Sequence, residues 1–290
     1  MKSSNPGAVL SLAHDAGSGL NDGEIMGLAL EELYSHYNRF EHIHPDPLEF
    51  VYLYDKKLDR ELIAFIASAL AYGRVGQILR SVRSVLDIMG PSPSSFLAEN
   101  RPAAIRKKFR FFKHRFTTGE ILSNLLVALK ELTLEYGSLE SCFRAGFSEN
   151  DPNILPALTG LVKKLEKACG RMLPTFLPSP DGGSACKRLN LFLRWMVRSD
   201  NVDPGIWQSI PASHLIVPLD THMHRIAAAM GLTSRKQADI RCAVEITEVF
   251  SAIRPDDPVR YDFALTRLGI KPGTPPTKFF SSLLSIGGQG

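Results

Sequence analysis

The sequence has few of the features that mark a membrane-spanning, secreted or metal-cluster protein. No apolar run approaches the ~18 residues that a membrane-spanning helix needs. Residues 1–23 are rich in Ser, Asn, Gly and Asp and carry one Lys, so we expect a flexible leader and no secretory signal. The four cysteines are 27, 17 and 56 residues apart and form no Cys-x-x-Cys pair. We therefore expect no metal centre, no cofactor and a reducing, cytoplasmic location.

The sequence has little excess charge of either sign, with a net charge of +4 over 290 residues, but its charged residues are unevenly distributed. Residues 1–100 carry 8 Lys and Arg against 13 Asp and Glu, whereas residues 101–200 carry 17 against 9. Residues 201–290 are nearly balanced, at 9 against 8. The basic middle third indicates either a face that binds a polyanion or a solvated basic surface.

Strand-like alternation is also scarce, and no repeat of fixed period is present, so the pattern predicts an all-α protein of about ten or more helices. Apolar residues recur at helical spacing in nine segments: Glu24–Phe40, Leu58–Ala71, Val75–Met89, Gly119–Tyr136, Ile154–Cys169, Ala185–Arg198, Thr221–Met230, Lys236–Ile253 and Pro258–Leu268. The segment Leu58–Ala71 is almost wholly apolar after its first turn, so we expect it at the centre of the core, with Asp59 as its N-cap.

The domain organisation expected from this pattern is one helical domain over residues 24–270, made of two lobes with a cleft between them. The Pro- and Gly-rich stretch Pro174–Gly183 is the longest internal break and marks a possible hinge between the lobes. Residues 271–290 are rich in Pro, Gly and Ser, which predicts a flexible tail.

The string Val217-Pro-Leu-Asp-Thr-His-Met-His-Arg-Ile226 is the first candidate for chemistry. Pro218 disfavours helix at the residue before it, and Asp220 then takes the N-cap position of the helical stretch that follows. A carboxylate there faces the positive end of the helix dipole and accepts backbone N–H groups. The alternative is a capping Asp with no further role. His222 and His224 cannot share a metal ion, because residues two apart on a helix point about 200° away from each other.

A second candidate is the basic and aromatic run Arg101–Phe116, which holds seven Lys and Arg, one His, four Phe and no acidic residue. Cations interleaved with aromatic rings suit phosphate contacts together with base stacking. The alternative is a buried Phe face, because Phe109, Phe112 and Phe116 match core spacing, with basic side chains that extend to solvent.

A third candidate is the helix Arg188–Arg198, whose apolar positions cover more than one face, so we expect it to be mostly buried. Arg194 and Arg198 are either phosphate or carboxylate clamps or members of a buried salt bridge, with Asp256, Asp257 or Asp262 as partner. Asp257 followed by Pro258 also predicts a helix start, with proline in the first helical position.

The string VPLDTHMHRIAAAMGL resembles the segment of helix-hairpin-helix DNA glycosylases in which V-x-D-T-H-x-x-R opens a helix. The resemblance implies that Asp220 is the catalytic carboxylate, with His222 and Arg225 among its matching neighbours. The segment LDRELIAFIASALAYGRVGQILRSVRSVLDIMGPSPSSFL is similar to the early helix pair of that family. Many members insert a Gln from the turn of this pair, whereas this chain has Ser68–Arg74, so the inserting residue must be another one.

The lysine nucleophile of the family corresponds best to Lys187, in the string SPDGGSACK. The hairpin consensus Leu-Pro-Gly-x-Gly is absent, and Lys187 lies 33 residues before Asp220, a longer gap than usual. An archaeal 8-oxoguanine glycosylase branch also has a divergent hairpin and a longer gap. A neutral lysine amine can attack the sugar C1′ and form a Schiff base, and Arg188 and Arg194 lie near enough to favour that form. The alternative is an exposed Lys in the first turn of a basic helix.

The chain also resembles a bacterial family of unknown function through the strings CKRLNLFLRWMVR, VPLDTHMHRIA and PDDPVRYDFALTRLGI, over roughly residues 25–270. That family has no established activity, so the glycosylase resemblance alone implies a DNA-glycosylase-like fold and a base-excision repair activity on duplex DNA with a damaged base. Abasic-site lyase activity is an extension of the same chemistry. The residues expected to contact nucleic acid are Arg74, Lys107, Lys108, Arg110, Arg188, His222 and Arg225.

Two further hypotheses differ in class from the glycosylase. The first keeps the fold without catalysis, as a monomeric protein that binds DNA or structured RNA, and the missing hairpin consensus favours it. The second is a hydrolase that uses His222 or His224 as a base on a small nucleotide. A lysine–carboxylate pair that faces one cleft is specific to the glycosylase hypothesis, so we expect Lys187 and Asp220 to lie close together.

Overall fold

The computed structural model describes residues 22–170 and 176–268, and in these ranges the chain is mostly helical, as predicted. The amino-terminal helices are α2 (Asp22–Tyr37), α3 (Lys57–Ala69), α4 (Val75–Met89), α5 (Pro93–Glu99), α6 (Pro102–Phe109), α7 (Gly119–Tyr136) and α8 (Leu139–Arg144). The carboxyl-terminal helices are α9 (Leu155–Cys169), α10 (Lys187–Val197), α11 (Thr221–Ala229), α12 (Ile240–Ile253) and α13 (Asp262–Leu268). Four 3-10 turns connect them, at η1 (Phe40–His42), η2 (Pro47–Leu53), η3 (Pro180–Gly182) and η4 (Ala212–His214).

A two-stranded antiparallel ribbon is the one sheet in the part of the chain that the structure describes. Strand β1 (Lys113–His114) pairs with β2 (Thr117–Thr118), in the register Lys113 with Thr118 and His114 with Thr117. The connecting residues Arg115 and Phe116 form the tip of this hairpin. The basic run of the sequence therefore divides into a helix, α6, and a hairpin.

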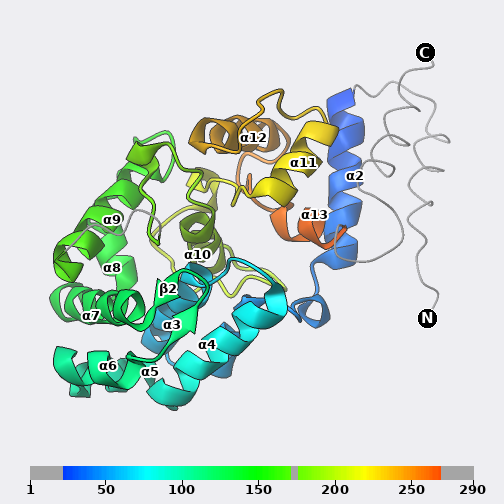
Figure 1. Ribbon diagram of the computed structural model, residues 1–290. Helices are drawn as coiled ribbons and strands as arrows, with labels where there is room; N and C mark the ends of the chain where they lie inside the picture. The colour runs from blue at the N-terminus through cyan, green and yellow to red at the C-terminus, as the bar shows by residue number, and fades with distance from the viewer. Residues whose placement is uncertain (1–21, 171–175, 269–290) are drawn as a thin grey trace.

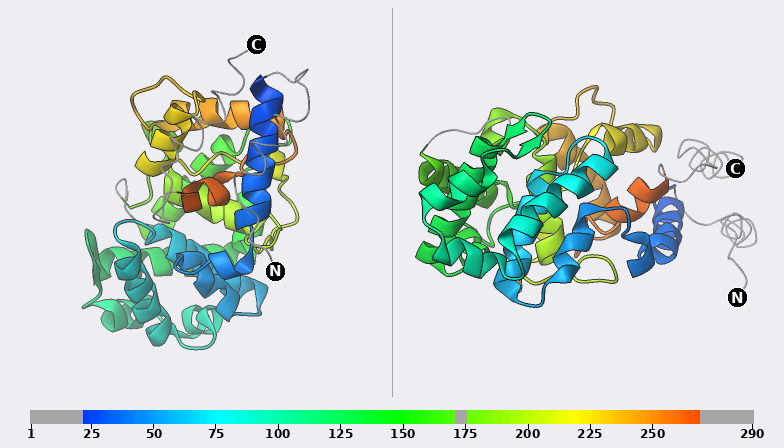
Figure 2. Two further views of the ribbon diagram at one scale, coloured as in Figure 1. Left: turned by 90° about the vertical axis from the view of Figure 1, so that its right-hand side faces the viewer. Right: turned by 60° about the horizontal axis from the view of Figure 1, so that its bottom comes forward.

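Helix α10 lies at the centre of the arrangement (Figure 1). Helices α3 to α9 lie on one side of it, and α11, α12, α13 and α2 lie on the other (Figures 1 and 2). The first helix, α2, packs against α13, so the amino- and carboxyl-terminal parts of the described chain meet. This arrangement brings the start of α10 next to the start of α11.

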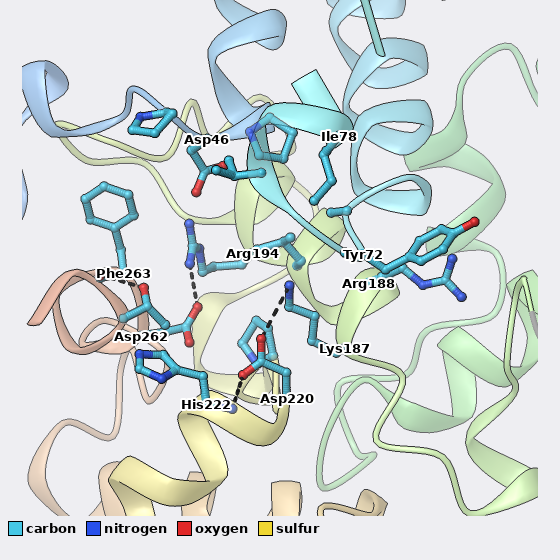
Figure 3. A pocket seen from close by; sticks show the side chains of 18 of the residues that line it. Asp46, Tyr72, Ile78, Lys187, Arg188, Arg194, Asp220, His222, Asp262 and Phe263 are labelled. Atoms are coloured by element: carbon cyan, nitrogen blue, oxygen red, sulfur yellow. Dashed lines mark hydrogen bonds and ion pairs between the residues drawn. The ribbon is translucent and has the colours of Figure 1, made fainter. Parts of the chain in front are cut away.

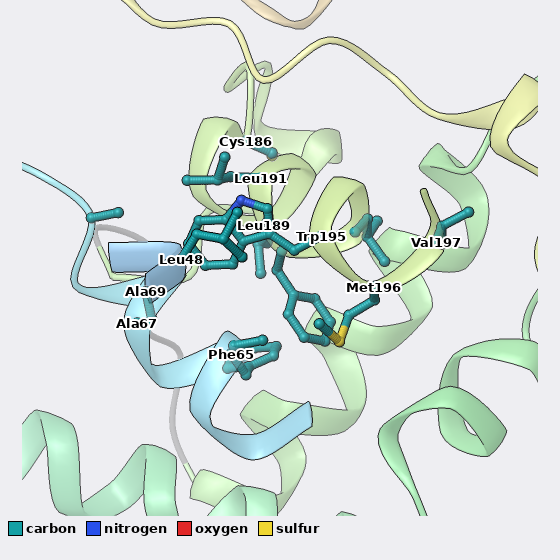
Figure 4. Close-up of a cluster of buried hydrophobic side chains, with 14 of the residues drawn as sticks. Leu48, Phe65, Ala67, Ala69, Cys186, Leu189, Leu191, Trp195, Met196 and Val197 are labelled. Carbon is teal, nitrogen blue, oxygen red and sulfur yellow. The ribbon is translucent and has the colours of Figure 1, made fainter. Parts of the chain in front are cut away.

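The core is built on α3 and α10, which pack against each other (Figure 4). Phe65 of α3 and Phe192 of α10 are fully buried, and their rings meet edge to face at 4.9 Å. Trp195 is also fully buried. Burying a large apolar side chain contributes roughly 1.5–3 kcal/mol, so this helix pair supplies much of the stability of the fold. The central position expected for the Leu58–Ala71 segment and the burial expected for α10 are both confirmed.

Asp59 does not cap the helix in whose first turn it lies. The N-cap of α3 is Lys56, and the Asp59 carboxylate accepts a 2.6 Å hydrogen bond from the Ser94 backbone N–H, at the start of α5. It also accepts from the Ser92 hydroxyl, at 3.2 Å. The predicted role at α3 is therefore wrong, because Asp59 is buried and satisfies the amino terminus of a neighbouring helix instead.

Several helix boundaries differ from the predicted ones, mostly by one to four residues. Helix α12 begins at Ile240 rather than Lys236, because Asp239 is its N-cap and accepts from the Cys242 N–H at 2.8 Å. The segment predicted to begin a helix at Asp257–Pro258 is a turn, and α13 starts only at Asp262. Helices α5, α6 and α8 were not predicted, because each has eight residues or fewer and shows little periodicity.

Parts of the predicted organisation lie outside the described residues. Residues 1–21 and 269–290, which hold most of the predicted leader and the tail, are among them, as are residues 171–175 at the predicted hinge. The leader, hinge and tail therefore stay predictions. Within the described ranges, no helix is both long enough and apolar enough to cross a membrane.

Candidate active site

Asp220 is the N-cap of α11, as the sequence predicts. Its Oδ1 accepts hydrogen bonds from the backbone N–H groups of His222 and Met223, both at 2.9 Å. The preceding residues, Val217 to Leu219, are buried and non-helical, so the carboxylate projects from a fixed strand-like lead. Because the cap uses one carboxylate oxygen, the other oxygen is free to face a second group.

Lys187 is that second group, and it occupies the first position of α10. Its Nζ lies 3.7 Å from Oδ2 of Asp220, and the two side chains are 29% and 40% exposed. The expected closeness of these two groups is confirmed, although 32 residues separate them in the chain. They retain access to solvent, so a ligand can reach both.

The residue before Lys187 fixes where α10 begins. Cys186 adopts a left-handed backbone conformation, with φ 49° and ψ 34°, which is uncommon for a residue with a side chain. Its buried thiol donates to the carbonyls of Pro178 and Ser184, and burial raises the pKa of this thiol to about 11. These contacts hold the strained residue in place, and the helix starts abruptly with Lys187 directed at Asp220 (Figure 3).

Lys187 and Asp220 line a cavity of about 650 Å³ (Figure 3). Its walls come from η2, the turn between α3 and α4, the start of α10, the start of α11 and α13. Tyr72 and Gly73 line it from the α3–α4 turn, and Phe263 lines it from α13. The volume falls in the range of small-molecule pockets, which is roughly 300–1,000 Å³.

Arg194 and Asp262 form the inner wall of the cavity. Arg194 Nη1 donates to Asp262 Oδ2 at 2.5 Å, and both side chains are 3% exposed. The second oxygen of Asp262, Oδ1, is buried and has no hydrogen-bond partner among the described residues. Burial raises the pKa of Asp262, against the opposing effect of Arg194. This unpartnered oxygen lies on a residue that lines the cavity, where a ligand N–H could satisfy it.

Arg194 and Arg198 belong to a buried network of ion pairs, which confirms the buried salt bridge among the predicted alternatives. Asp203 is at its centre and accepts from both arginines. Arg198 also donates to Asp257 and Asp200, at 2.9 and 2.7 Å. Sequence reasoning missed Asp203, since nothing in the local sequence Asn-Val-Asp-Pro distinguishes it.

This network changes two expectations. Asp257 does not start a helix, because its carboxylate accepts from Nε of Arg198. Arg194 does not act on Lys187 as an uncompensated cation, because Asp203 and Asp262 balance its charge. Of the three predicted acidic partners, Asp256 alone lies outside the network, exposed and 3.9 Å from Arg254.

Arg188, next to Lys187, is largely engaged within the protein. Its Nη1 donates to the carbonyl of Ala69 at 2.6 Å, and its guanidinium lies 4.9 Å from the ring of Tyr72 and 5.5 Å from that of Phe176. Burial lowers the pKa of Arg188 from its ordinary high value. It lines the cavity as a stacked, half-buried cation.

The two histidines of the 217–226 string diverge, as the helix geometry predicts. His222 lines the cavity, and its Nε2 is buried without a hydrogen-bond partner among the described residues. His224 donates from Nε2 to the carbonyl of Arg235 at 2.8 Å. Arg225 is exposed, and its Nη2 lies 3.4 Å from Nδ1 of His222. Across residues 22–170 and 176–268, no group of three or more His, Cys, Asp or Glu side chains is arranged to hold a metal ion.

The remaining predicted nucleic-acid contacts are exposed but do not line the main cavity. Arg74 is the N-cap residue of α4, next to the cavity-lining Gly73. Lys107, Lys108 and Arg110 lie at the carboxyl end of α6. Their role in binding stays a prediction.

The alternative reading of the basic run, a buried face of three phenylalanines, is wrong for one of them. Phe109 is fully buried and Phe112 is partly buried against the core, but Phe116 is 79% exposed. The hairpin explains the difference, because it ends the helical spacing before position 116.

Fold and site together define a mostly helical protein in which a lysine and an N-cap aspartate from two different helices face one cavity. The chain belongs to the family described as "Protein of unknown function (DUF2400)", whose match spans residues 46–271. No curated protein and no solved structure matches the chain. The likeness to DNA glycosylases is therefore carried by the residues of the site alone and stays a prediction.

Proposed function

We propose that this protein is a DNA base-excision glycosylase with abasic-site lyase activity, in which Lys187 is the nucleophile and Asp220 the charge-stabilising carboxylate. The observation that carries the proposal is the 3.7 Å contact between Lys187 Nζ and Asp220 Oδ2 at the wall of a cavity of about 650 Å³. One amine and one carboxylate that reach the same carbon are the minimum that this chemistry needs.

The first step breaks the N-glycosidic bond of a nucleotide whose base has left the stack and entered the cavity. The base departs with the bonding electron pair and takes up a proton. Positive charge develops at C1′ and O4′ of the sugar, and the Asp220 carboxylate stabilises it. Two backbone N–H groups hold that carboxylate, so it needs no reorganisation as the charge appears.

The second step forms a covalent bond between Lys187 and the sugar. The amine, after its proton has passed to Asp220 or to the departing base, attacks C1′ with its lone pair. The C1′–O4′ bond then breaks, O4′ becomes a hydroxyl, and Nζ and C1′ form an iminium. Loss of a proton from C2′ expels the 3′ phosphate, and water releases the lysine by hydrolysis of the imine. These steps need no oxidant or reductant.

In this proposal the fold is glycosylase-like and has two lobes. One lobe consists of α3 to α9 and the other of α2 and α11 to α13, and the cavity is the cleft between them. Arg74, Arg225 and His222 border this cavity or adjoin residues that line it, so they are positioned for phosphates next to the extruded nucleotide. Lys107, Lys108 and Arg110 lie farther along the basic run and would follow the duplex backbone. Arg188 would hold its neighbour Lys187 and Tyr72 in position rather than bind phosphate, since its guanidinium is stacked.

Borohydride trapping tests the proposal directly, because borohydride reduces the iminium to a stable amine. Full-length protein would be incubated with duplexes that carry 8-oxoguanine, uracil or an abasic site, and adducts would be counted by denaturing gel. We expect an adduct on at least one duplex and its complete loss in Lys187→Gln. Lys163→Gln is the matched control, because Lys163 also pairs with an aspartate, Asp181 at 3.2 Å, but lies on α9 and does not line the cavity.

Two outcomes would overturn the proposal. An adduct that persists in Lys187→Gln would assign the nucleophile elsewhere. Duplex binding without an adduct on any of these substrates would favour a nucleic-acid-binding protein of the same fold. Thermal unfolding of both variants distinguishes a lost nucleophile from a lost fold.

A further inference from the structure

The hairpin tip Arg115–Phe116 carries a large exposed aromatic side chain. Phe116 is 79% exposed, and only Phe111, at 83%, is more exposed among the large apolar residues that the structure describes. Each of the two rings is paired with an arginine: Arg110 lies 4.3 Å from the ring of Phe111, and Arg115 lies 5.5 Å from that of Phe116. Two exposed rings, each beside a guanidinium, suit a partner that offers flat aromatic faces and negative charge.

The hairpin is anchored firmly to the α3–α4 turn. The Tyr72 hydroxyl donates to the carbonyl of His114 at 2.8 Å and contacts the Thr117 hydroxyl at 2.7 Å. The buried His114 ring hydrogen-bonds to the Tyr72 carbonyl at 3.1 Å and to Ser81 at 2.8 Å. The tip therefore projects from a fixed base, so its position is set before a partner binds.

The same anchor places the tip beside the cavity. Tyr72 and Gly73 line the cavity, and the Arg115 guanidinium lies 5.9 Å from the Tyr72 ring. A Cβ at Gly73 would come within 2.8 Å of Arg115 Cδ and Nη1. With φ at 100°, Gly73 also has a backbone conformation that side chains disfavour. The backbone conformation of the turn therefore favours glycine at this position, and the end of the Arg115 side chain lies against it.

We propose that Phe116 inserts into the base stack of duplex DNA, in the gap left by the nucleotide that enters the cavity, while Arg115 contacts a flanking phosphate. This inference rests on the proposed function for the identity of the cavity ligand. Extrusion of a nucleotide leaves two unstacked neighbours, and an aromatic side chain in the gap replaces part of the lost stacking. Phe116 supplies that ring from a hairpin anchored to the cavity-lining Tyr72, and its position on the hairpin differs from the turn position expected from the glycosylase resemblance.

The charge of the surrounding segment supports a nucleic acid as the partner. Residues 101–116 contain seven Lys and Arg and no Asp or Glu, so the exposed rings belong to a segment that carries positive charge only. Three of these seven cations are lysines, which protein interfaces disfavour at their centres. A duplex satisfies both the rings and the charge.

The test measures base unstacking with 2-aminopurine, whose fluorescence rises when it leaves the stack. Duplexes would carry 2-aminopurine next to an abasic-site analogue that cannot be cleaved. We expect Phe116→Ala to lose most of the fluorescence increase and to bind about 5- to 100-fold more weakly, in line with the loss of one aromatic–base stack. Phe116→Trp should retain the signal.

Phe111→Ala is the matched control, since Phe111 is similarly exposed and paired with arginine but lies in the turn after α6, off the hairpin tip that is anchored to the cavity-lining Tyr72. It should retain the fluorescence increase. Equal signals from Phe116→Ala and wild type, or equal losses from both alanine variants, would overturn the inference. Trapping on a single-stranded abasic oligonucleotide separates the two proposals: Phe116→Ala should still form the adduct, because no base needs to leave a stack there. If no adduct forms in any protein, the fluorescence comparison still decides the role of the hairpin.

Discussion

Helix α10 carries two cation–carboxylate arrangements that differ in every respect except their helix. At its first residue, Lys187 faces Asp220 across 3.7 Å, and both side chains remain accessible. Two turns later, Arg194 and Arg198 are 3% exposed, and their partners include Asp203, which is fully buried. The first arrangement has one contact between its charges, whereas the second has contacts to several carboxylates.

The difference distinguishes an accessible ion pair, which a substrate could reach, from a buried network that stabilises the fold. Each arginine donates to at least two carboxylates, so the two guanidinium groups have little capacity left for a ligand, although Oδ1 of Asp262 has no partner among the described residues. Lys187 and Asp220 share a single long contact, so each has hydrogen-bonding capacity left for a substrate. The sequence shows charged residues on the same helix in both cases, and only their burial and partners distinguish them.

The largest effect is expected when the buried network loses a charge. Arg194→Met leaves buried Asp262 without its cation and Asp203 with Arg198 alone, so we expect the free energy of unfolding to fall by about 3–5 kcal/mol. Lys187→Gln is the control and should change it by less than about 1 kcal/mol, since that pair is partly exposed. Urea denaturation followed by circular dichroism measures both. Similar losses in the two variants would contradict the distinction between the regions.

A smaller effect is expected at Asp220, where charge and capping can be separated. Asp220→Asn keeps a side-chain oxygen for the two backbone N–H groups but removes the negative charge, so the trapping rate should fall about 10²–10³-fold with little change in stability. Asp220→Ala should show the same rate loss and an additional destabilisation of about 1 kcal/mol, because α11 loses its cap. A wild-type trapping rate in Asp220→Asn would show that the Lys187–Asp220 pair, like the buried network, has only a structural role.

The smallest effect concerns His114, which is buried in the hairpin and contacts the cavity-lining Tyr72. It belongs to neither of the two cation–carboxylate arrangements. Its Nε2 donates to the Tyr72 carbonyl, and in the neutral ring Nδ1 accepts from Ser81. Burial lowers the pKa of His114 below its ordinary value near 6.5. The unfolded chain therefore binds a proton below about pH 6.5 that the folded chain does not, and stability declines as the pH falls through this range.

His114→Gln should remove this part of the pH dependence. Thermal unfolding at pH 7.5 and 5.5 measures it, and we expect the drop in Tm between the two values to shrink by about 1–3 °C in the variant. Identical pH dependence in wild type and variant would show that the hairpin anchor does not sense protons.

Much of the fold follows from local patterns in the sequence. The continuous apolar stretch of α3 and the many-sided apolar helix α10 predict their own burial, because no other arrangement removes so much apolar surface from water. Asp220 is predictable for a related reason: a proline two residues earlier and helical spacing afterwards leave it only the capping position. The closeness of Lys187 to Asp220 was expected from the glycosylase resemblance, and periodicity alone contains no information about it.

The rest depends on contacts between distant residues. Asp59 has the local signature of a cap for its own helix, but tertiary packing places it at the start of α5, 35 residues further along. Asp262 meets Arg194 across 68 residues, and only its charge hinted at a partner. Phe116 follows core spacing in the sequence but is exposed, because it lies at the tip of the hairpin, between the two short strands. Local rules cannot detect such cases, because the deciding neighbour is remote.

Ion pairs join the elements that form the walls of the cavity and make these walls rigid. Arg194 ties α10 to α13 through Asp262, and Arg267 ties α13 to Asp46 at 2.9 Å, just ahead of η2. Walls joined in this way have little freedom to adapt, so under the proposed function the DNA, rather than the protein, would deform when a nucleotide enters the cavity. A DNA duplex weakened by a mismatch or a lesion deforms most easily. Stiffness alone would then favour damaged sites over intact ones, before any atom of the base is recognised.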